Sequence, residues 1–257
     1  MKIAITGKGG VGKTTFAAVL ARIFADEGHS VLCADVDPDA NLGLALGASE
    51  EELASITPIT EMKEMIKERT HADEFEKFFK INPKVDDLPD RLAHEINGVK
   101  FMIMGTIKTG GAGCVCPEHV ILKRLLSHMI VGRDDVVILD MEAGLEHLAR
   151  GTTDFVDRFI VVVEPGARSI QTYHNVKRLA ADLGVRQVNV VANKVRDKAD
   201  EAFILENVPA EDLLGIIHYS NEVTDADRRS ASPYDIASST VEEIRGIKEK
   251  MSKDGRE

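Results

Sequence analysis

Gly7-Lys-Gly-Gly-Val-Gly-Lys-Thr-Thr15 stands between a short apolar stretch, Lys2–Thr6, and a segment with helical periodicity, Thr14–Gly28. Glycines allow consecutive backbone N–H groups to converge on phosphate oxygens without obstruction by side chains. The start of a helix adds a partial positive charge at the same place. A glycine-rich loop that joins a strand to a helix and ends in Lys-Thr is therefore predicted to bind phosphate, as a P-loop.

The residues of this loop have separate expected roles. The Lys13 ammonium can reach the β- and γ-phosphates, the Thr14 hydroxyl can be a ligand of Mg²⁺, and Thr15 can approach the α-phosphate. The peptide groups expected to enclose the phosphates belong to Gly9, Gly10, Val11 and Gly12. We expect the chain to bind Mg·ATP here and to hydrolyse it to ADP and phosphate.

Outward from the loop, apolar runs alternate with helical patterns along the chain. Runs such as Val136–Leu139 and Ile160–Val163 are continuous, which is typical of parallel strands buried on both faces. The predicted fold is α/β, a doubly wound, mostly parallel sheet of about seven or eight strands with helices on both faces. The predicted strands are Lys2–Thr6, Ser30–Asp35, Lys100–Met104, Val136–Asp140, Phe159–Glu164, Gln187–Asn193 and Leu214–His218. The predicted helices are Thr14–Gly28, Glu118–Val131, Ser169–Leu183 and Ser239–Met251.

One stretch interrupts this alternation. Ser49–Glu95 is acidic and contains no convincing strand, whereas Glu61–Lys80 within it has the apolar spacing of a helix. We expect residues 1–257 to form a single P-loop ATPase domain with a helical insertion at about 49–95. The insertion is either surface decoration or a docking surface for a partner.

The composition restricts the partners. The chain has 257 residues and a net charge of −11, from 32 basic and 43 acidic side chains. Such a charge repels nucleic acid and anionic membranes unless basic groups cluster, and the basic residues of Arg245–Lys253 are interleaved with glutamates. No apolar stretch reaches the ~18 residues of a membrane span, and no signal peptide precedes the P-loop. We expect a cytoplasmic protein that binds neither nucleic acid nor membrane.

Two predicted strands end in aspartate. Ser30–Asp35 leads into Val-Asp-Pro-Asp-Ala-Asn41, and Val136–Asp140 leads into Met-Glu-Ala-Gly144. An apolar strand that ends in aspartate downstream of a P-loop has the Walker B pattern, whose carboxylate holds Mg²⁺. We predict that Asp140 holds Mg²⁺ through water, and that residues 142–144 form a switch that responds to the γ-phosphate.

The second lysine of the loop, Lys8, gives it the form Lys-Gly-Gly-x-Gly-Lys-Thr. In this respect the chain resembles the deviant Walker A ATPases, which include nitrogenase iron protein, septum-site and partition ATPases, and metallocentre maturation ATPases. The resemblance implies a homodimer in which Lys8 reaches the partner's phosphates and neutralises charge there, as an arginine finger does. The alternative is an exposed lysine near the phosphates of its own subunit.

The same resemblance implies roles beyond the loop. Asp37 would orient or activate the attacking water, and Asp39 and Asn41 are second choices that would act through Mg²⁺ or its waters. Asn193 would contact adenine through its amide. Asp35 is expected to cap its strand or to bind a structural water. The implied catalytic residues are Lys8, Lys13 and Asp37.

The segment Gly110–Pro117 contains two of the three cysteines, Cys114 and Cys116. In extended geometry residues i and i+2 point to the same side, so both thiolates can be presented together. A symmetric dimer would supply four thiolates, enough for nickel, zinc or another thiophilic ion, and His119 could contribute. Cys33 lies in an apolar strand and is expected to be an inert core residue.

Together with this Cys-x-Cys segment, the run Asp140–Gly151 narrows the resemblance to the CooC type of accessory ATPase, which serves nickel insertion into carbon monoxide dehydrogenase. The resemblance covers nearly the whole chain. It implies that ATP favours a closed dimer that binds nickel between paired Cys-x-Cys motifs. Hydrolysis would then release the metal to a client enzyme, carbon monoxide dehydrogenase.

Two other functions remain open. An iron–sulfur reductase or carrier would use Cys114 as a cluster ligand, but Met141–Leu145 lacks the further cluster cysteine of nitrogenase iron protein. A positioning ATPase of the septum-site or partition type needs a membrane-binding C-terminal helix or a basic surface for DNA. Thr240–Met251 is too polar for the first, and the net charge of −11 argues against the second.

Overall fold

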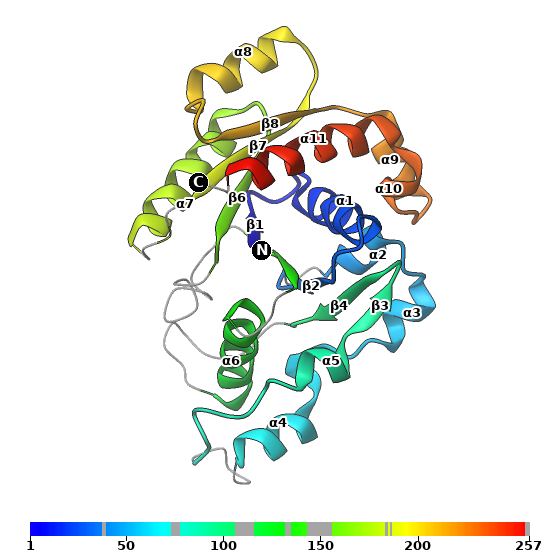
Figure 1. The fold of residues 1–257 in the computed structure, drawn as a ribbon, viewed down its shortest axis with the longest axis vertical. Coiled ribbons are helices and arrows are strands. Elements are labelled where there is room, and N and C mark those ends of the chain that lie inside the picture. The colour runs from blue at the N-terminus through cyan, green and yellow to red at the C-terminus, as the bar shows by residue number, and fades with distance from the viewer. Residues whose placement is uncertain are drawn as a thin grey trace.

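The computed structural model describes residues 1–37, 40–72, 78–105, 116–131, 135–142, 156–182, 185 and 187–254. Its strands form one sheet in the order β3-β4-β2-β5-β1-β6-β7-β8 (Figure 1). Neighbouring strands pair in parallel except in the antiparallel hairpin of β3 and β4. The strands are β1 Lys2–Thr6, β2 Val31–Asp35, β3 His94–Ile96, β4 Val99–Ile103, β5 Val136–Asp140, β6 Arg158–Val163, β7 Val188–Val195 and β8 Leu213–His218.

The helices follow the strands in the alternation expected of an α/β protein, and Figure 1 shows them around the sheet. They are α1 Lys13–Asp26, α2 Leu42–Leu46, α3 Glu50–Ser55, the 3₁₀ turn η1 Ile59–Glu61, α4 Lys63–Thr70, α5 Leu88–Leu92, α6 Pro117–Val131, α7 Ala167–Asp182, α8 Lys198–Asn207, α9 Asn221–Arg228, α10 Pro233–Ile236 and α11 Ser238–Asp254. Among the described residues, no helix is both long and apolar enough to cross a membrane.

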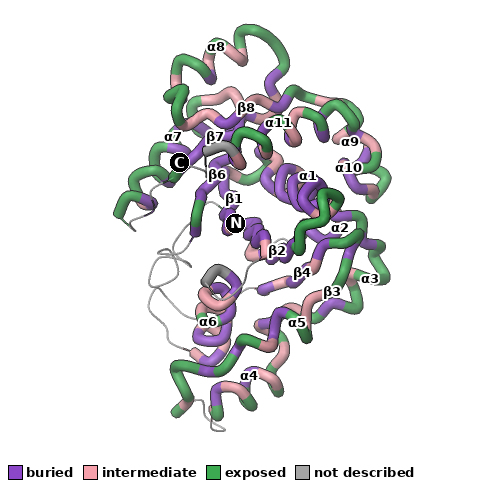
Figure 2. The backbone as a smooth tube through the Cα atoms, viewed as in Figure 1, coloured by how far each residue is buried: buried purple, intermediate pink, exposed green. Residues whose placement is uncertain are grey.

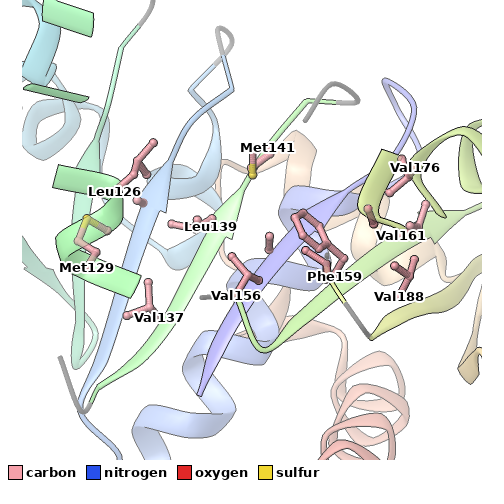
Figure 3. Packing of buried hydrophobic residues seen from close by; sticks show 14 of the residues in the cluster. Leu126, Met129, Val137, Leu139, Met141, Val156, Phe159, Val161, Val176 and Val188 are labelled. Atoms are coloured by element: carbon pink, nitrogen blue, oxygen red, sulfur yellow. The ribbon is translucent and has the colours of Figure 1, made fainter. Parts of the chain in front are cut away.

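The two faces of the sheet carry separate hydrophobic cores, because successive side chains of a strand point to opposite faces. Ala4 packs with α6, α7 and the α4–α5 region, whereas Ile3 and Ile5 pack with α1, α2 and α11. Figure 3 shows the first core, which includes Leu126 and Met129 of α6 and Val137 and Leu139 of β5. In Figure 2 the strands in the middle of the sheet, such as β1 and β5, and helix α1 are largely buried, which explains why these strand sequences are apolar without alternation.

The predicted fold class is confirmed, but the insertion differs from the prediction in two ways. The strand β3 lies partly within the stretch expected to lack strands. Two of its three residues are exposed, so it has no apolar run, but Asn97-Gly98 is a hairpin signal that marks its turn. Helix α4 ends at Thr70, where His71 adopts φ 53°, and Phe78–Lys80 are not helical although the spacing of Glu61–Lys80 predicted a helix.

Candidate functional site

The P-loop lies at the carboxyl end of β1, in the middle of the sheet. Strands β5 and β6 flank β1 and run parallel to it, so the carboxyl ends of these strands lie at the same edge of the sheet. In sheets of this type, ligands bind outside the carboxyl ends of the strands. A cavity of about 550 Å³ occupies this place. On the loop side it is lined by Gly9, Gly10, Gly12, Lys13, Thr14 and Thr15.

The backbone of the loop depends on glycine at the start of α1. Gly12 precedes the helix with φ 94°, in the left-handed region that side chains disfavour. A Cβ at this position would also lie 2.3 Å from Nδ2 of Asn193. The loop and the end of β7 therefore approach each other more closely than any other residue type would permit.

Half-buried Thr14 and buried Asp140 form a pair beside the loop. The Thr14 hydroxyl donates a hydrogen bond of 2.7 Å to Oδ2 of Asp140. The other oxygen, Oδ1, is buried and has no hydrogen-bond partner among the described residues. Burial raises the pKa of Asp140 to about 6, even though the Thr14 hydroxyl and Lys13 lower it. An orphaned carboxylate oxygen next to a hydroxyl is a donor set that suits hydrated Mg²⁺.

Lys13 and Asp37 face the same cavity. Their closest charged atoms, Nζ and Oδ2, are 3.7 Å apart, and their side chains are 6% and 17% exposed. Asp37 therefore lies beside the lysine expected to hold the γ-phosphate. Asn41 and Glu142 also line the cavity, whereas Asp39 and residues 143–144 lie outside the described residues.

Asp35 holds the segment that carries Asp37. Its carboxylate accepts hydrogen bonds from the backbone N–H of Asp37, at 3.1 Å, and of Leu42, at 2.9 Å. Burial, together with the nearby Asp140 carboxylate, raises the pKa of Asp35 to about 7, although the hydrogen bond from the Leu42 N–H lowers it. Asp35 thus caps the segment after β2, in keeping with its expected capping role.

An Asp35→Asn variant is expected to lower kcat for ATP about tenfold while changing KM little, because an amide cannot accept both N–H bonds and Asp37 loses its orientation. Steady-state kinetics measure both constants. The control is Asp86→Asn, which changes a half-exposed carboxylate in the insertion. An equal loss in both variants, or a change in KM alone, would contradict this role.

The end of β7 contacts the P-loop directly. Nδ2 of Asn193 donates a hydrogen bond of 2.8 Å to the carbonyl of Val11, and the Lys194 ammonium donates to the carbonyl of Gly10. Oδ1 of Asn193 accepts from the N–H of Lys194 at 2.9 Å. Asn193 also lines a smaller cavity of about 70 Å³ together with Thr15, Phe16 and residues of β8 and α11. Asn193 therefore lines this smaller cavity while its side-chain amide is hydrogen-bonded to the P-loop.

Other residues that line the cavity come from elements that carry no sequence motif, and the sequence did not indicate them. They are Leu44 and Ala45 of α2 and residues of α9 and of the stretch from α9 to the start of α10. Ser232 donates to the carbonyl of Ala45 at 2.7 Å, and Arg22 and Asn97 donate to that of Leu46 at 3.2 and 2.9 Å. These bonds attach the C-terminal end of α2 to three distant parts of the chain.

The other expected residues that the structure describes, Lys8 and Cys116, do not line this cavity. Lys8 is half-buried and is not among the residues that line the cavity. Cys116 is half-buried directly before α6, Cys33 is fully buried, and Cys114 lies outside the described residues. Within the described ranges, no three His, Cys, Asp or Glu side chains gather as they would around a metal ion.

Comparisons with known proteins also indicate a nucleotide binding domain. The model of the CobQ/CobB/MinD/ParA nucleotide binding domain matches residues 2–233. Carbon monoxide dehydrogenase accessory protein CooC of Rhodospirillum rubrum is 44% identical over 238 residues, which cover 92% of this chain and 90% of that protein. An uncharacterized ATP-binding protein of Methanocaldococcus jannaschii is 45% identical over 253 residues, 96% of each chain.

Among solved structures, a putative plasmid partition protein of Borrelia burgdorferi bound to AMPPNP superposes with a TM-score of 0.69. The superposition covers 98% of this chain and 99% of that one, at 16% sequence identity. At such identity the likeness concerns the fold alone.

Proposed function

Because this chain belongs to the CobQ/CobB/MinD/ParA nucleotide binding family and is a P-loop ATPase, we propose that it uses ATP to control a dimer that carries nickel to carbon monoxide dehydrogenase. The observation that carries the proposal is the 44% identity to an accessory protein of that enzyme over 92% of the chain. The Cys-x-Cys segment Cys114–Cys116 supplies the chemistry for a thiophilic cargo.

The ATPase part of the proposal is supported by the arrangement at the loop. Mg²⁺, when bound, neutralises phosphate charge; the Thr14 hydroxyl and, through water, Oδ1 of Asp140 are the groups that would hold it. Lys13 binds the β- and γ-phosphates. Asp37, 3.7 Å from Lys13, orients the attacking water and can accept its proton. Lys13 and Thr14 begin α1, Asp140 ends β5, and Asp37 follows the end of β2.

Lys8 is the reason for proposing that the active form is a dimer. It follows Gly7, yet it is not among the residues that line the cavity of its own subunit. A lysine in this loop that does not face its own cavity is free to serve a second copy of the chain. Two copies related by a two-fold axis would exchange their lysines symmetrically, so that each phosphate site is completed by its partner.

The same symmetry supports the metal site. One chain supplies two thiolates, Cys114 and Cys116, whereas soft divalent ions take about four ligands. Cys116 stands directly before α6. Two copies would provide four thiolates at the axis. Closing the dimer around ATP would then assemble the metal site, and hydrolysis would open it.

Anaerobic titration of the protein with nickel, with and without AMPPNP, tests this function. We expect about one ion per dimer, bound more tightly with AMPPNP, and loss of binding in the Cys114→Ser/Cys116→Ser variant. Cys33→Ser is the control, because that thiol is fully buried and should not contribute. Bound nickel that survives the double substitution would rule out the Cys-x-Cys site.

The iron–sulfur alternative gives a different result in the same preparation. Protein purified anaerobically would then be brown and would contain iron with acid-labile sulfide. A positioning ATPase would instead sediment with anionic liposomes or bind DNA at moderate salt.

A further inference from the structure

The end of β7 contacts the P-loop through two consecutive side chains, which is unusual for a strand. Successive side chains of a strand normally point to opposite faces. Here Lys194 adopts φ 60°, and the pairing of β7 with β8 is irregular between Ala192 and Val195. This break in the alternation lets the side chains of Asn193 and Lys194 both reach the loop.

The contacts fix the direction of two peptide units. Asn193 binds the carbonyl of Val11, and Lys194 binds the carbonyl of Gly10. In a trans peptide the carbonyl and the N–H of one unit point in opposite directions. Holding these carbonyls toward β7 therefore turns the N–H groups of Gly12 and Val11 away from β7. The N–H of Val11 donates to the carbonyl of Lys8 at 3.4 Å within the loop, and a P-loop presents such backbone N–H groups to phosphate.

The amide of Asn193 is itself oriented by the chain. Its Oδ1 accepts from the N–H of Lys194 at 2.9 Å, so Nδ2 is the atom that faces Val11. The approach is so close that a Cβ on Gly12 would lie 2.3 Å from that Nδ2. The conformation of the P-loop and the conformation of the end of β7 therefore depend on each other.

We propose that Asn193 and Lys194 are positioning residues for the phosphate groups, because they orient the peptide units of the P-loop. This role differs from a contact between Asn193 and the base, and it would be lost equally for every ligand that carries the phosphate chain. The inference rests on nucleotide binding at the P-loop. It does not depend on the proposed nickel cargo, on the dimer or on the client enzyme.

Binding of ATP and of inorganic tripolyphosphate, both with Mg²⁺, separates the two roles, because tripolyphosphate has no base. Isothermal titration of Asn193→Ala should show that both ligands lose affinity by the same factor, about tenfold for one lost hydrogen bond. Loss for ATP alone would assign Asn193 to the base and overturn the proposal. Unchanged affinity for both ligands would overturn it as well.

A matched control exists in α8. Nδ2 of Asn207 also donates to a backbone carbonyl at 2.8 Å, that of Phe203, and Asn207 is half-buried like Asn193. Asn207→Ala should leave both affinities unchanged. Thermal unfolding without ligand shows whether each variant is folded. If Asn207→Ala weakens both ligands as much as Asn193→Ala, the effect is one of general stability and the proposal is wrong.

Lys194 provides a second test by conservative replacement. Lys194→Met removes the ammonium and should weaken both ligands, whereas Lys194→Arg retains a charged donor and should recover most of the loss. Failure of Lys194→Arg to recover more than Lys194→Met would contradict a role through hydrogen bonding. Binding of Mg·ATP by the wild-type protein tests the nucleotide site itself, so that claim and this one fail separately.

Discussion

An Lys8→Ala variant is expected to hydrolyse ATP about 10³-fold more slowly than the wild-type protein, the lower range of effects measured for arginine fingers. Since Lys8 does not line the cavity of its own subunit, the loss should appear in turnover while the affinity of the isolated subunit for ADP stays unchanged. The measurements are steady-state ATPase activity and ADP titration. Lys67→Ala, on the exposed face of α4, is the control and should keep full activity.

Mixing two inactive variants distinguishes a lysine that acts across a dimer from one that acts within its own subunit. Lys13→Ala lacks a working P-loop but still carries Lys8, and it can donate that lysine to an Lys8→Ala partner. Random exchange of subunits should then restore about a quarter of wild-type activity, because half of the dimers are mixed and each has one working site. A mixture as inactive as its components would place Lys8 in the site of its own subunit.

Replacing Asp140 with asparagine should produce two opposite effects. Hydrolysis with Mg²⁺ should fall at least 10³-fold, since the carboxylate expected to hold the ion is lost. The protein without metal and nucleotide should become more stable at pH 8, because a buried carboxylate with an unpaired oxygen is replaced by a neutral group. Activity assays and thermal unfolding in EDTA check the two parts.

The pH dependence gives the size and sign of the stability change. Burial raises the pKa of Asp140 from 3.8 to about 6, so the folded protein binds the proton more tightly than the unfolded chain does. The stability contributed by this group is therefore complete below about pH 4 and is lost as the pH rises through about 6. Above pH 7, removing the charge should therefore raise the free energy of unfolding by about 3 kcal/mol. An unpaired buried amide lowers this gain by about 1 kcal/mol.

A net gain of about 2 kcal/mol corresponds to a rise in Tm of about 4–8 °C for a chain of this length. The gain should disappear at pH 4, where the wild-type carboxyl group is protonated. Asp227→Asn is the matched control, because that side chain lines the same cavity but is exposed, and its Tm should not change at either pH. A variant less stable than wild type at pH 8 would show that the charge of Asp140 is compensated in the folded protein.

The sequence predicted those parts of the molecule whose structure is determined by residues close together in the chain. Continuous apolar runs such as Ile160–Val163 predicted buried parallel strands, and the order Lys-Gly-Gly-x-Gly-Lys-Thr predicted both the loop and the family, which are confirmed. Strand β3 was missed because His94 and Glu95 are exposed and leave no apolar pattern. The dipeptide Asn97-Gly98 was the available signal, and it would have placed the hairpin.

The residues that sequence could not place act through contacts across the chain. Asn193 was assigned to adenine by resemblance, and nothing near it indicates that its amide meets Val11, 182 positions away. The same holds for α9, whose Val223 and Asp227 line the cavity without belonging to any motif. Such contacts depend on how strands are ordered in the sheet, which local patterns do not determine.

Asp35 fixes both ends of a short segment, since one carboxylate binds the N–H of Asp37 and that of Leu42. Beyond Leu42, helix α2 is attached at its far end through the carbonyls of Ala45 and Leu46. Asp37, Leu42 and the C-terminal end of α2 are thus each held by a hydrogen bond from another part of the chain. A conformational change that moved α2 away from the cavity would have to break these bonds.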